Sequence, residues 1–325
     1  MGKNVLILES GGSKFITGVI SEGEVDIKGK RKVGIQAQSS EEFLNNVLEN
    51  MERSLHSSGY SIDDIDSVGA ISAGVWRYKS GEVIPPNLSF GNSRIPLGRR
   101  IKERFEKPTY VENDVNAAVM AEKLFGYGKD KDVRILGYLT ISTGIGLGLL
   151  DMERNELLSG DSGKAPEVGH NVLVPDGLEC GCGGKGHWEA YGSGTGICKL
   201  AKDMSGDSEY CASTKELLEK ASNGDDFALR VVKKVARYNA IGIGHIINQH
   251  QPGALIIGGT PVIKFPELML EPVKELLNNP PCENSFTYIP KEDLPEITKT
   301  DLGCDNVAYG AASIALEQID RNRVV

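Results

Sequence analysis

The chain has 325 residues, of which 40% are hydrophobic and 25% are charged, and its formal net charge is −9. This composition is typical of a globular enzyme with one large or two smaller domains, and the negative charge argues against a nucleic-acid-binding protein, which usually presents a basic face. The sequence shows no signal-peptide pattern and no run of about 18 apolar residues, so we expect no membrane span. Six cysteines do not make a disulfide scaffold in a chain of this length, and we expect a reducing, cytoplasmic location.

Short apolar strands alternate with glycine-rich or polar turns in two parts of the chain. Residues 5–8, 15–20 and 25–27 are the first set of predicted strands, and Glu9-Ser10-Gly11-Gly12-Ser13-Lys14 joins the first two. A similar order recurs later, with strands at 135–141 and 147–150 around the turn at 142–146, and a polar turn at 153–156. A duplicated unit is less readily produced by chance than a single motif, so we interpret it as an internal repeat.

Helical patterns occupy the rest of the chain. Apolar residues recur at helical spacing in four segments, 40–56, 115–125, 225–249 and 309–319. A further strand is expected at 254–257, before Gly258-Gly259. Strands that alternate with helices indicate an α/β fold.

Three glycine turns follow apolar strands, at Gly11-Gly12, Thr143-Gly144-Ile145-Gly146 and Gly258-Gly259. Glycines in this position let backbone N–H groups approach phosphate oxygens. Any one of them is more often an ordinary turn, but three in one chain favour a nucleotide cleft between two related domains. None fits the P-loop pattern or the full dinucleotide-binding fingerprint.

The segment 167–189 holds four side chains that suit a zinc ion, which are His170, Cys180, Cys182 and His187. Their spacing differs from that of common zinc fingers, and buried thiols are an alternative explanation. The surrounding glycines favour a metal, because tight wrapping around an ion needs unusual backbone angles. Glu167 and Glu189 bracket the four residues, which suggests a substrate pocket beside the metal.

Asn113-Asp114 precedes the helix expected at 115–125. Either residue could simply cap that helix, since both types are favoured at this position. The alternative is a carboxylate aimed into the cleft, where it would accept the hydroxyl proton during phosphoryl transfer to an alcohol.

Taken together and in order, these motifs resemble those of the ROK family of repressors, uncharacterised reading frames and sugar kinases. The similar segments are Ser10-Gly11-Gly12-Ser13-Lys14, Ala73-Gly74 with Gly81-x-Val83 and Pro86-Asn87-Leu88, Asn113-Asp114-x-Asn116-Ala117, Thr143-Gly144-Ile145-Gly146, Glu167-x-Gly169-His170, Cys180-Gly-Cys182-Gly with Glu189-Ala190, and Gly258-Gly259. The resemblance covers nearly the whole chain and implies an actin-like (ribonuclease H-like) α/β fold with two domains around a deep cleft. We expect a smaller domain of residues 1–116 plus 305–325 and a larger one of 117–304.

The resemblance also implies a role for each matched residue. Asp114 would be the catalytic base on the 6-hydroxyl of a sugar. Sugar contacts would come from Gly74, Asn87, Asn113, Asp114, Glu167, His170 and Glu189. ATP and its Mg²⁺ would be held by Glu9, Gly11, Gly12, Ser13, Lys14, Thr143, Gly144, Gly258 and Gly259. A structural Zn²⁺ would bind His170, Cys180, Cys182 and His187, and the protein would be a homodimer.

Three departures from the family pattern bear on these roles. His187 stands where the family usually has a third cysteine, and imidazole can replace thiolate at zinc. Glu9 stands where the family has aspartate near the nucleotide's Mg²⁺. Trp188 replaces a smaller residue, and we expect it to pack over the zinc loop, with a change in the sugar site as the alternative.

The sugar and the function class each have alternatives. The loop at 73–93 and the region of Trp188 would decide the sugar, and they depart most from ordinary glucokinases. The whole pattern is most similar to archaeal-type N-acetylmannosamine kinases, so the resemblance implies N-acetylmannosamine as the acceptor, with glucose second. A sugar-sensing repressor would need a DNA-binding segment before the first glycine turn, where only eight residues precede Glu9. A non-sugar actin-like ATPase is disfavoured by the segment from Glu167 to Glu189.

Overall fold

The computed structural model describes residues 2–11, 13–85, 93–160, 164, 166–282, 286–318 and 324–325. Two five-stranded sheets with equivalent strand orders form its framework. The first sheet runs in the order β3 (Lys28–Gly34), β2 (Lys14–Ser21), β1 (Asn4–Ser10), β4 (Ser67–Ser72) and β7 (Thr109–Glu112). The second runs in the order β10 (Glu156–Leu157), β9 (Ile145–Asp151), β8 (Ile135–Ile141), β11 (Ala254–Gly258) and β12 (Glu296–Lys299). A separate hairpin pairs β5 (Val75–Arg77) with β6 (Glu82–Ile84).

The expected internal repeat is confirmed. In the first sheet β1 pairs antiparallel with β2 and parallel with β4, and in the second β8 pairs antiparallel with β9 and parallel with β11. The third strand of the first unit was placed wrongly at 25–27, since it spans Lys28–Gly34 and Val25 is 59% exposed. Its sequence, Lys-Gly-Lys-Arg-Lys-Val-Gly, lacks apolar periodicity because β3 is an edge strand, where lysines discourage pairing with other chains.

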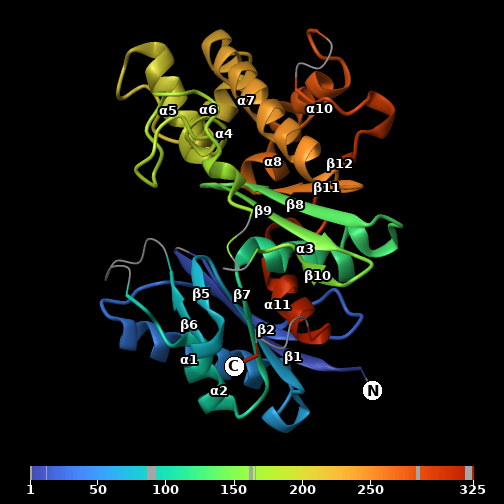
Figure 1. Cartoon of the computed structure of the whole chain (residues 1–325). Helices are drawn as coiled ribbons and strands as arrows, with labels where there is room; N and C mark the ends of the chain where they lie inside the picture. Colours follow the sequence, from blue (N-terminus) through green and yellow to red (C-terminus); the bar gives the residue numbers. More distant parts are fainter. Residues whose placement is uncertain are drawn as a thin grey trace.

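Helices cover both sheets and also separate them (Figure 1). Helices α1 (Ser40–Ser58) and α2 (Leu97–Phe105) pack on the outer face of the first sheet, and α3 (Asp114–Leu124) and α11 (Asn306–Leu316) lie between the sheets. The outer side of the second sheet carries α4 (Glu189–Gly192), α5 (Gly194–Ser205), α6 (Thr214–Ser222), α7 (Asp226–His250), α8 (Thr260–Lys264), α9 (Pro266–Met269) and α10 (Glu271–Asn278). The four helices expected from periodicity are confirmed to within three residues at each end.

The central layer joins the two halves of the molecule. One buried cluster contains Val5 of β1, Ile256 of β11 and the alanines of α3 and α11. Small residues let these helices approach closely, because a Cβ on Gly310 would lie 2.3 Å from the Ala117 carbonyl oxygen. A Cβ on Gly69 of β4 would lie 1.8 Å from the Ala311 carbonyl oxygen, so α11 returns to the first sheet as expected. The domain limits at 116–117 and 304–305 stay a prediction, since this cluster spans both sheets.

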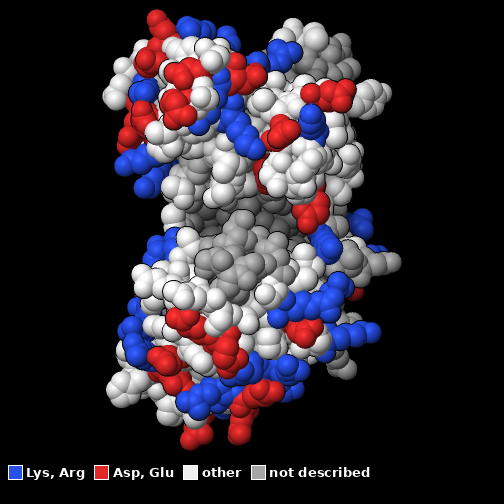
Figure 2. All heavy atoms as spheres, turned by 90° about the vertical axis from the view of Figure 1, so that its left-hand side faces the viewer, with Lys and Arg blue, Asp and Glu red and all other residues white. Residues whose placement is uncertain are grey.

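The surface has two lobes with a hollow at the waist between them (Figure 2). Charged side chains lie mainly over the outer parts of the lobes in this view. Among the described residues, no helix is both long and apolar enough to cross a membrane.

Candidate active site

The expected site residues of the first lobe meet at one edge of its sheet. Glu9 and Ser10 end β1, and the Ala73 N–H that follows β4 donates to the Ser10 carbonyl oxygen at 3.1 Å. Gly74 comes next, with φ of 113°, a backbone angle that favours glycine. Asp114 follows the neighbouring strand β7. Parallel strands end at the same edge, which is where α/β folds bind ligands.

Asn113 caps α3, and this leaves Asp114 free for chemistry. The Asn113 side chain accepts a hydrogen bond from the Asn116 N–H at 2.9 Å, as an N-cap residue does. Asp114 is the first residue of the helix, and its Oδ1 accepts only from the adjacent Val115 N–H, at 3.0 Å, among the described residues. Burial raises the pKa of Asp114. A carboxylate with a raised pKa is better suited to accepting a proton.

Glu112 supports this segment, a role that the sequence did not indicate although Glu112 lies in the candidate segment. Its buried carboxylate accepts from the Tyr78 hydroxyl at 2.7 Å, from the Asn113 N–H at 2.8 Å and from the Asn116 side chain at 3.2 Å. These bonds fix the backbone from which Asp114 projects. The signal in the sequence was a charged residue at the end of an otherwise buried strand, Thr-Tyr-Val-Glu.

The glycine turns fold as tight turns at the strand ends. The Gly11 N–H donates to the Lys14 carbonyl oxygen at 2.9 Å, and Ser13 lies in this turn. In the second lobe the Ser142 N–H donates to the Gly144 carbonyl oxygen at 2.9 Å, across Thr143. Gly12 and Asn87, both expected in the site, lie outside the described residues.

The third glycine turn packs directly on the second. Gly259 has φ of 104°, and a Cβ there would lie 2.1 Å from the Ile141 carbonyl oxygen. A Cβ on Gly258 would lie 1.9 Å from the Tyr138 hydroxyl. Burial raises the pKa of Tyr138, and the carboxylates of Asp114 and Glu9 add to the effect. Charges of the first lobe therefore lie near the Gly258-Gly259 turn of the second.

Glu9 lies among charged groups of the cleft. Its pKa is raised to about 7, mainly by burial; the Asp114 and Asp305 carboxylates contribute to the rise, and the Lys14 and Lys32 ammonium groups oppose it. Its Oε2 is buried and has no hydrogen-bond partner among the described residues. A buried carboxylate oxygen of this kind suits a hard cation such as Mg²⁺, directly or through water.

The structure brings the four expected zinc ligands together. One ligand atom each from His170, Cys180, Cys182 and His187 lies within 4.8 Å of the other three. Cys180 Sγ is 3.8 Å from His170 Nδ1, and Cys182 Sγ is 3.2 Å from His187 Nδ1. Zinc bonds of about 2.0–2.3 Å in a tetrahedron separate the ligand atoms by about 3.3–3.8 Å. The two Sγ–Nδ1 distances are close to that range, and the wider separations, up to 4.8 Å, would have to shorten around an ion.

Glycines shape the loop that carries these ligands. Gly183 and Gly186 have φ of 90° and 71°, and a Cβ on Gly186 would lie 1.7 Å from the Val174 carbonyl oxygen. The Gly183 N–H donates to the Cys180 carbonyl oxygen at 3.0 Å, which closes the turn around Cys182. The expectation that glycines allow tight wrapping here is confirmed.

Glu189 connects this loop to the second glycine turn. Its Oε1 accepts from the Cys180 thiol at 3.6 Å, and its Oε2 accepts from the Ile145 N–H at 2.9 Å. A Cβ on Gly144 would lie 2.5 Å from the same Oε2. Glu167 is exposed overall, but partial burial raises the pKa of its carboxyl group; His170 opposes the rise, and Glu189 and Asp114 add to it. The charges of Glu189, His170 and Asp114 therefore all act on the Glu167 carboxyl group.

Trp188 packs inside the second lobe. Its side chain is fully buried, and its Nε1–H donates to Asn239 Oδ1 at 2.8 Å. A Cβ on Gly242 of α7 would lie 2.3 Å from the indole ring. The indole therefore has a packing role, as expected, but the contacts that show it are with α7, and its packing over the zinc loop stays a prediction.

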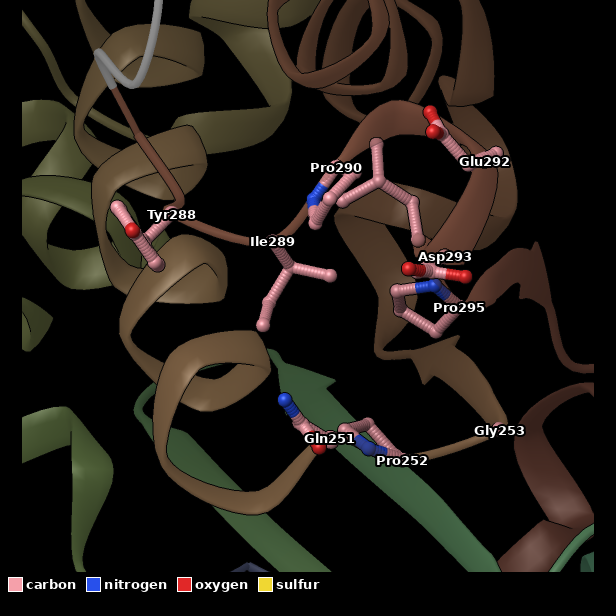
Figure 3. Close-up of a pocket in the computed structure, with 10 residues that line it drawn as sticks. Gln251, Pro252, Gly253, Tyr288, Ile289, Pro290, Glu292, Asp293 and Pro295 are labelled. Carbon is pink, nitrogen blue, oxygen red and sulfur yellow. The ribbon is translucent and has the colours of Figure 1, made fainter.

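Two further features lie outside this site. A disulfide joins Cys198 of α5 to Cys211, and no spacing in the sequence indicated it. A surface groove of about 890 Å³ runs along the segment from Tyr288 to Pro295 (Figure 3). It also borders Gln251–Gly253, which precede β11, whereas Gly258-Gly259 follow that strand. The groove is therefore at the opposite end of β11 from the candidate site.

Comparison with known proteins decides the family. The sequence model described as the ROK family matches residues 5–318. The chain belongs to the ROK family. A glucokinase from Aeropyrum pernix is 32% identical, with 96% of each chain covered. The fold is accordingly the actin-like two-domain α/β fold that the sequence indicated.

Two solved ROK structures resemble the whole chain. The ROK hexokinase from Thermus thermophilus is 27% identical, with a TM-score of 0.79 over 97% of this chain and 99% of that one. The ROK glucokinase from Streptomyces griseus, solved with glucose and AMPPNP, is 27% identical, with a TM-score of 0.74 over 96% of this chain and 98% of that one. These relatives support an ATP-dependent sugar kinase, the class that the sequence indicated.

Proposed function

We propose that this ROK protein transfers the γ-phosphoryl group of ATP to the 6-hydroxyl of a hexose. The observation that carries the proposal is Asp114, a carboxylate of raised pKa at the start of α3 that would share the cleft with the three glycine turns. The sugar oxygen would attack the γ-phosphorus while Asp114 accepts the hydroxyl proton, and the bond to the ADP oxygen would break. Glu112 would keep Asp114 in position through Asn113.

The remaining residues would divide between the two substrates. The turns at Gly11, Thr143-Gly144 and Gly258-Gly259 would present backbone N–H groups to the nucleotide. Glu9 would hold Mg²⁺, which neutralises phosphate charge when bound. Asn113, Glu167, His170 and Glu189 offer the donors and acceptors that match sugar hydroxyls.

A zinc ion would set the geometry of the sugar end. We propose that it binds His170, Cys180, Cys182 and His187, whose ligand atoms already lie within 4.8 Å of one another. Cys180 also contacts Glu189, so the metal would fix the carboxylate as well as the imidazole of His170. Groups that surround metal ligands commonly orient them in this way.

Glucose is the acceptor that we propose first. The relative from Aeropyrum pernix is named a glucokinase and matches along almost the full length, and the Streptomyces griseus relative was solved with glucose. N-acetylmannosamine, the sugar expected from the sequence, stays a second prediction. Its axial N-acetyl group would need a cavity and a polar partner, and a site built for such a partner discriminates strongly against sugars that lack it.

A coupled ADP-release assay across glucose, mannose, N-acetylglucosamine and N-acetylmannosamine tests this proposal. We expect sugar-dependent ADP formation with the highest kcat/KM for glucose, and a 6-phosphate product by ³¹P NMR. A higher kcat/KM for N-acetylmannosamine would reverse our choice of sugar. ATP hydrolysis that does not respond to any sugar would contradict the kinase proposal itself.

Two expectations from the family extend the proposal to the whole molecule. The boundary between the domains would lie at 116–117 and 304–305, in or beside the central helices α3 and α11. The protein would be a homodimer, which light scattering coupled to size-exclusion chromatography would test.

A further inference from the structure

Strand pairing places two lysines side by side at the cleft end of the first sheet. Lys14 lies opposite Gly34 and Ile16 lies opposite Lys32 in the antiparallel pair of β2 and β3. Alternate residues of a strand share a face, so Lys14 and Lys32 are diagonal neighbours on one face, within reach of long side chains. Ile16, on the same face, belongs to the central core with α11. The two lysines therefore project on the side of the sheet that faces the second lobe.

The positive charges of both lysines act on the Glu9 carboxylate. The charges of Lys14 and of Lys32 each lower the pKa of Glu9, whereas Asp114 raises it. Partial burial lowers the pKa of Lys14, and the adjacent Lys32 ammonium lowers it further. The pair thus lies at the end of the cleft where Asp114 would act.

Among the described residues neither lysine forms a direct ion pair, although the Glu9 carboxylate lies near enough to feel both charges. Lys28 and Lys30 of the same strand are paired with Glu24 at 2.9 Å and with Asp305 at 2.6 Å. Within the described ranges, no carboxylate oxygen lies within 4.0 Å of either Lys14 or Lys32 Nζ. Two like charges held together repel each other, and an anion between them would offset that repulsion.

We propose that Lys32 binds the terminal phosphates of the nucleotide together with Lys14, as a second cation of the donor site. The inference rests on the proposed function, because it takes ATP as the donor. Lysine is a compact, mobile point charge that suits phosphate oxygens. The turn at Gly11 would hold the phosphates through backbone N–H groups, while Lys14 and Lys32 would supply charge from the β2–β3 side.

Isothermal titration of Lys32→Met with ATP, ADP and AMP, in the presence of Mg²⁺, tests the proposal. We expect ATP and ADP to bind about tenfold more weakly than to the wild type, and AMP to bind within about twofold, because only the outer phosphates would reach Lys32. Lys32→Arg should restore most of the loss. Lys28→Met is the matched control, since Lys28 lies on the same strand but is paired with Glu24.

Three outcomes would overturn the inference in different ways. ATP affinity of Lys32→Met within twofold of the wild type would remove the role of Lys32 and leave the kinase proposal intact. An equal loss for AMP would show a general disturbance of the site instead of a phosphate contact. A wild-type protein that binds no ATP would refute the proposed function as well.

Discussion

Removal of one zinc ligand should weaken sugar binding more than it weakens the fold. Cys180 is 5% exposed and lies between His170 and Glu189, so Cys180→Ala takes away a metal ligand and a contact to the carboxylate. Each charged hydrogen bond to the sugar contributes about 1.5–3 kcal/mol, and 1.4 kcal/mol corresponds to tenfold in affinity. If one such bond is lost, KM for the sugar should rise about 10- to 100-fold.

Elemental analysis and steady-state kinetics measure the two parts of this prediction. The wild type should contain one zinc per chain, and Cys180→Ala should contain almost none, with KM for the sugar raised and KM for ATP changed little. Cys282→Ala is the control, because Cys282 is exposed and lies outside the zinc loop. Full zinc content in Cys180→Ala, or full activity of metal-free wild type, would refute the reasoning.

Three more predictions concern pH and stability. Burial raises the pKa of Glu122 to about 7. The folded state therefore binds the proton of the Glu122 carboxyl group more tightly than the unfolded chain does, and the free energy of unfolding should fall by about 3 kcal/mol from pH 4.5 to 8. In denaturant titrations, Glu122→Gln should lose this part of the pH dependence. A pH dependence equal to that of the wild type would exclude the role of Glu122. The Cys198–Cys211 disulfide closes a short loop. Replacing both cysteines with serine should therefore lower the free energy of unfolding in urea by about 3 kcal/mol, and an unchanged value would show that the bond does not stabilise the fold. Since a general base must be ionised, kcat/KM should fall as the pH drops through the raised pKa of Asp114. A kcat/KM that does not change at low pH would argue against Asp114 as the base.

Much of the site could be predicted because its signals are local. The four candidate metal ligands lie within one segment from His170 to His187, so residue type and glycine content were enough to propose the cluster that the structure assembles. The strand–turn–strand repeat was visible because β1, β2, β8 and β9 are apolar, whereas the lysine-rich edge strand β3 was misplaced.

The contacts that sequence could not reveal join distant segments. Glu112 meets the Tyr78 hydroxyl from 34 residues away, and Glu189 meets the Ile145 N–H from 44 residues away. Only the packing of the elements brings such pairs together. The same holds for Lys14 and Lys32, whose proximity follows from the β2–β3 register and not from a motif.

Turnover of Asp114→Asn at saturating ATP and sugar tests the central claim most directly. The substitution keeps the size of the side chain and an oxygen for the Val115 N–H, but it removes the proton acceptor. We predict that kcat falls by about 10²- to 10⁴-fold while circular dichroism and KM for the sugar stay close to those of the wild type. A correctly folded Asp114→Asn variant with nearly wild-type turnover would contradict the account.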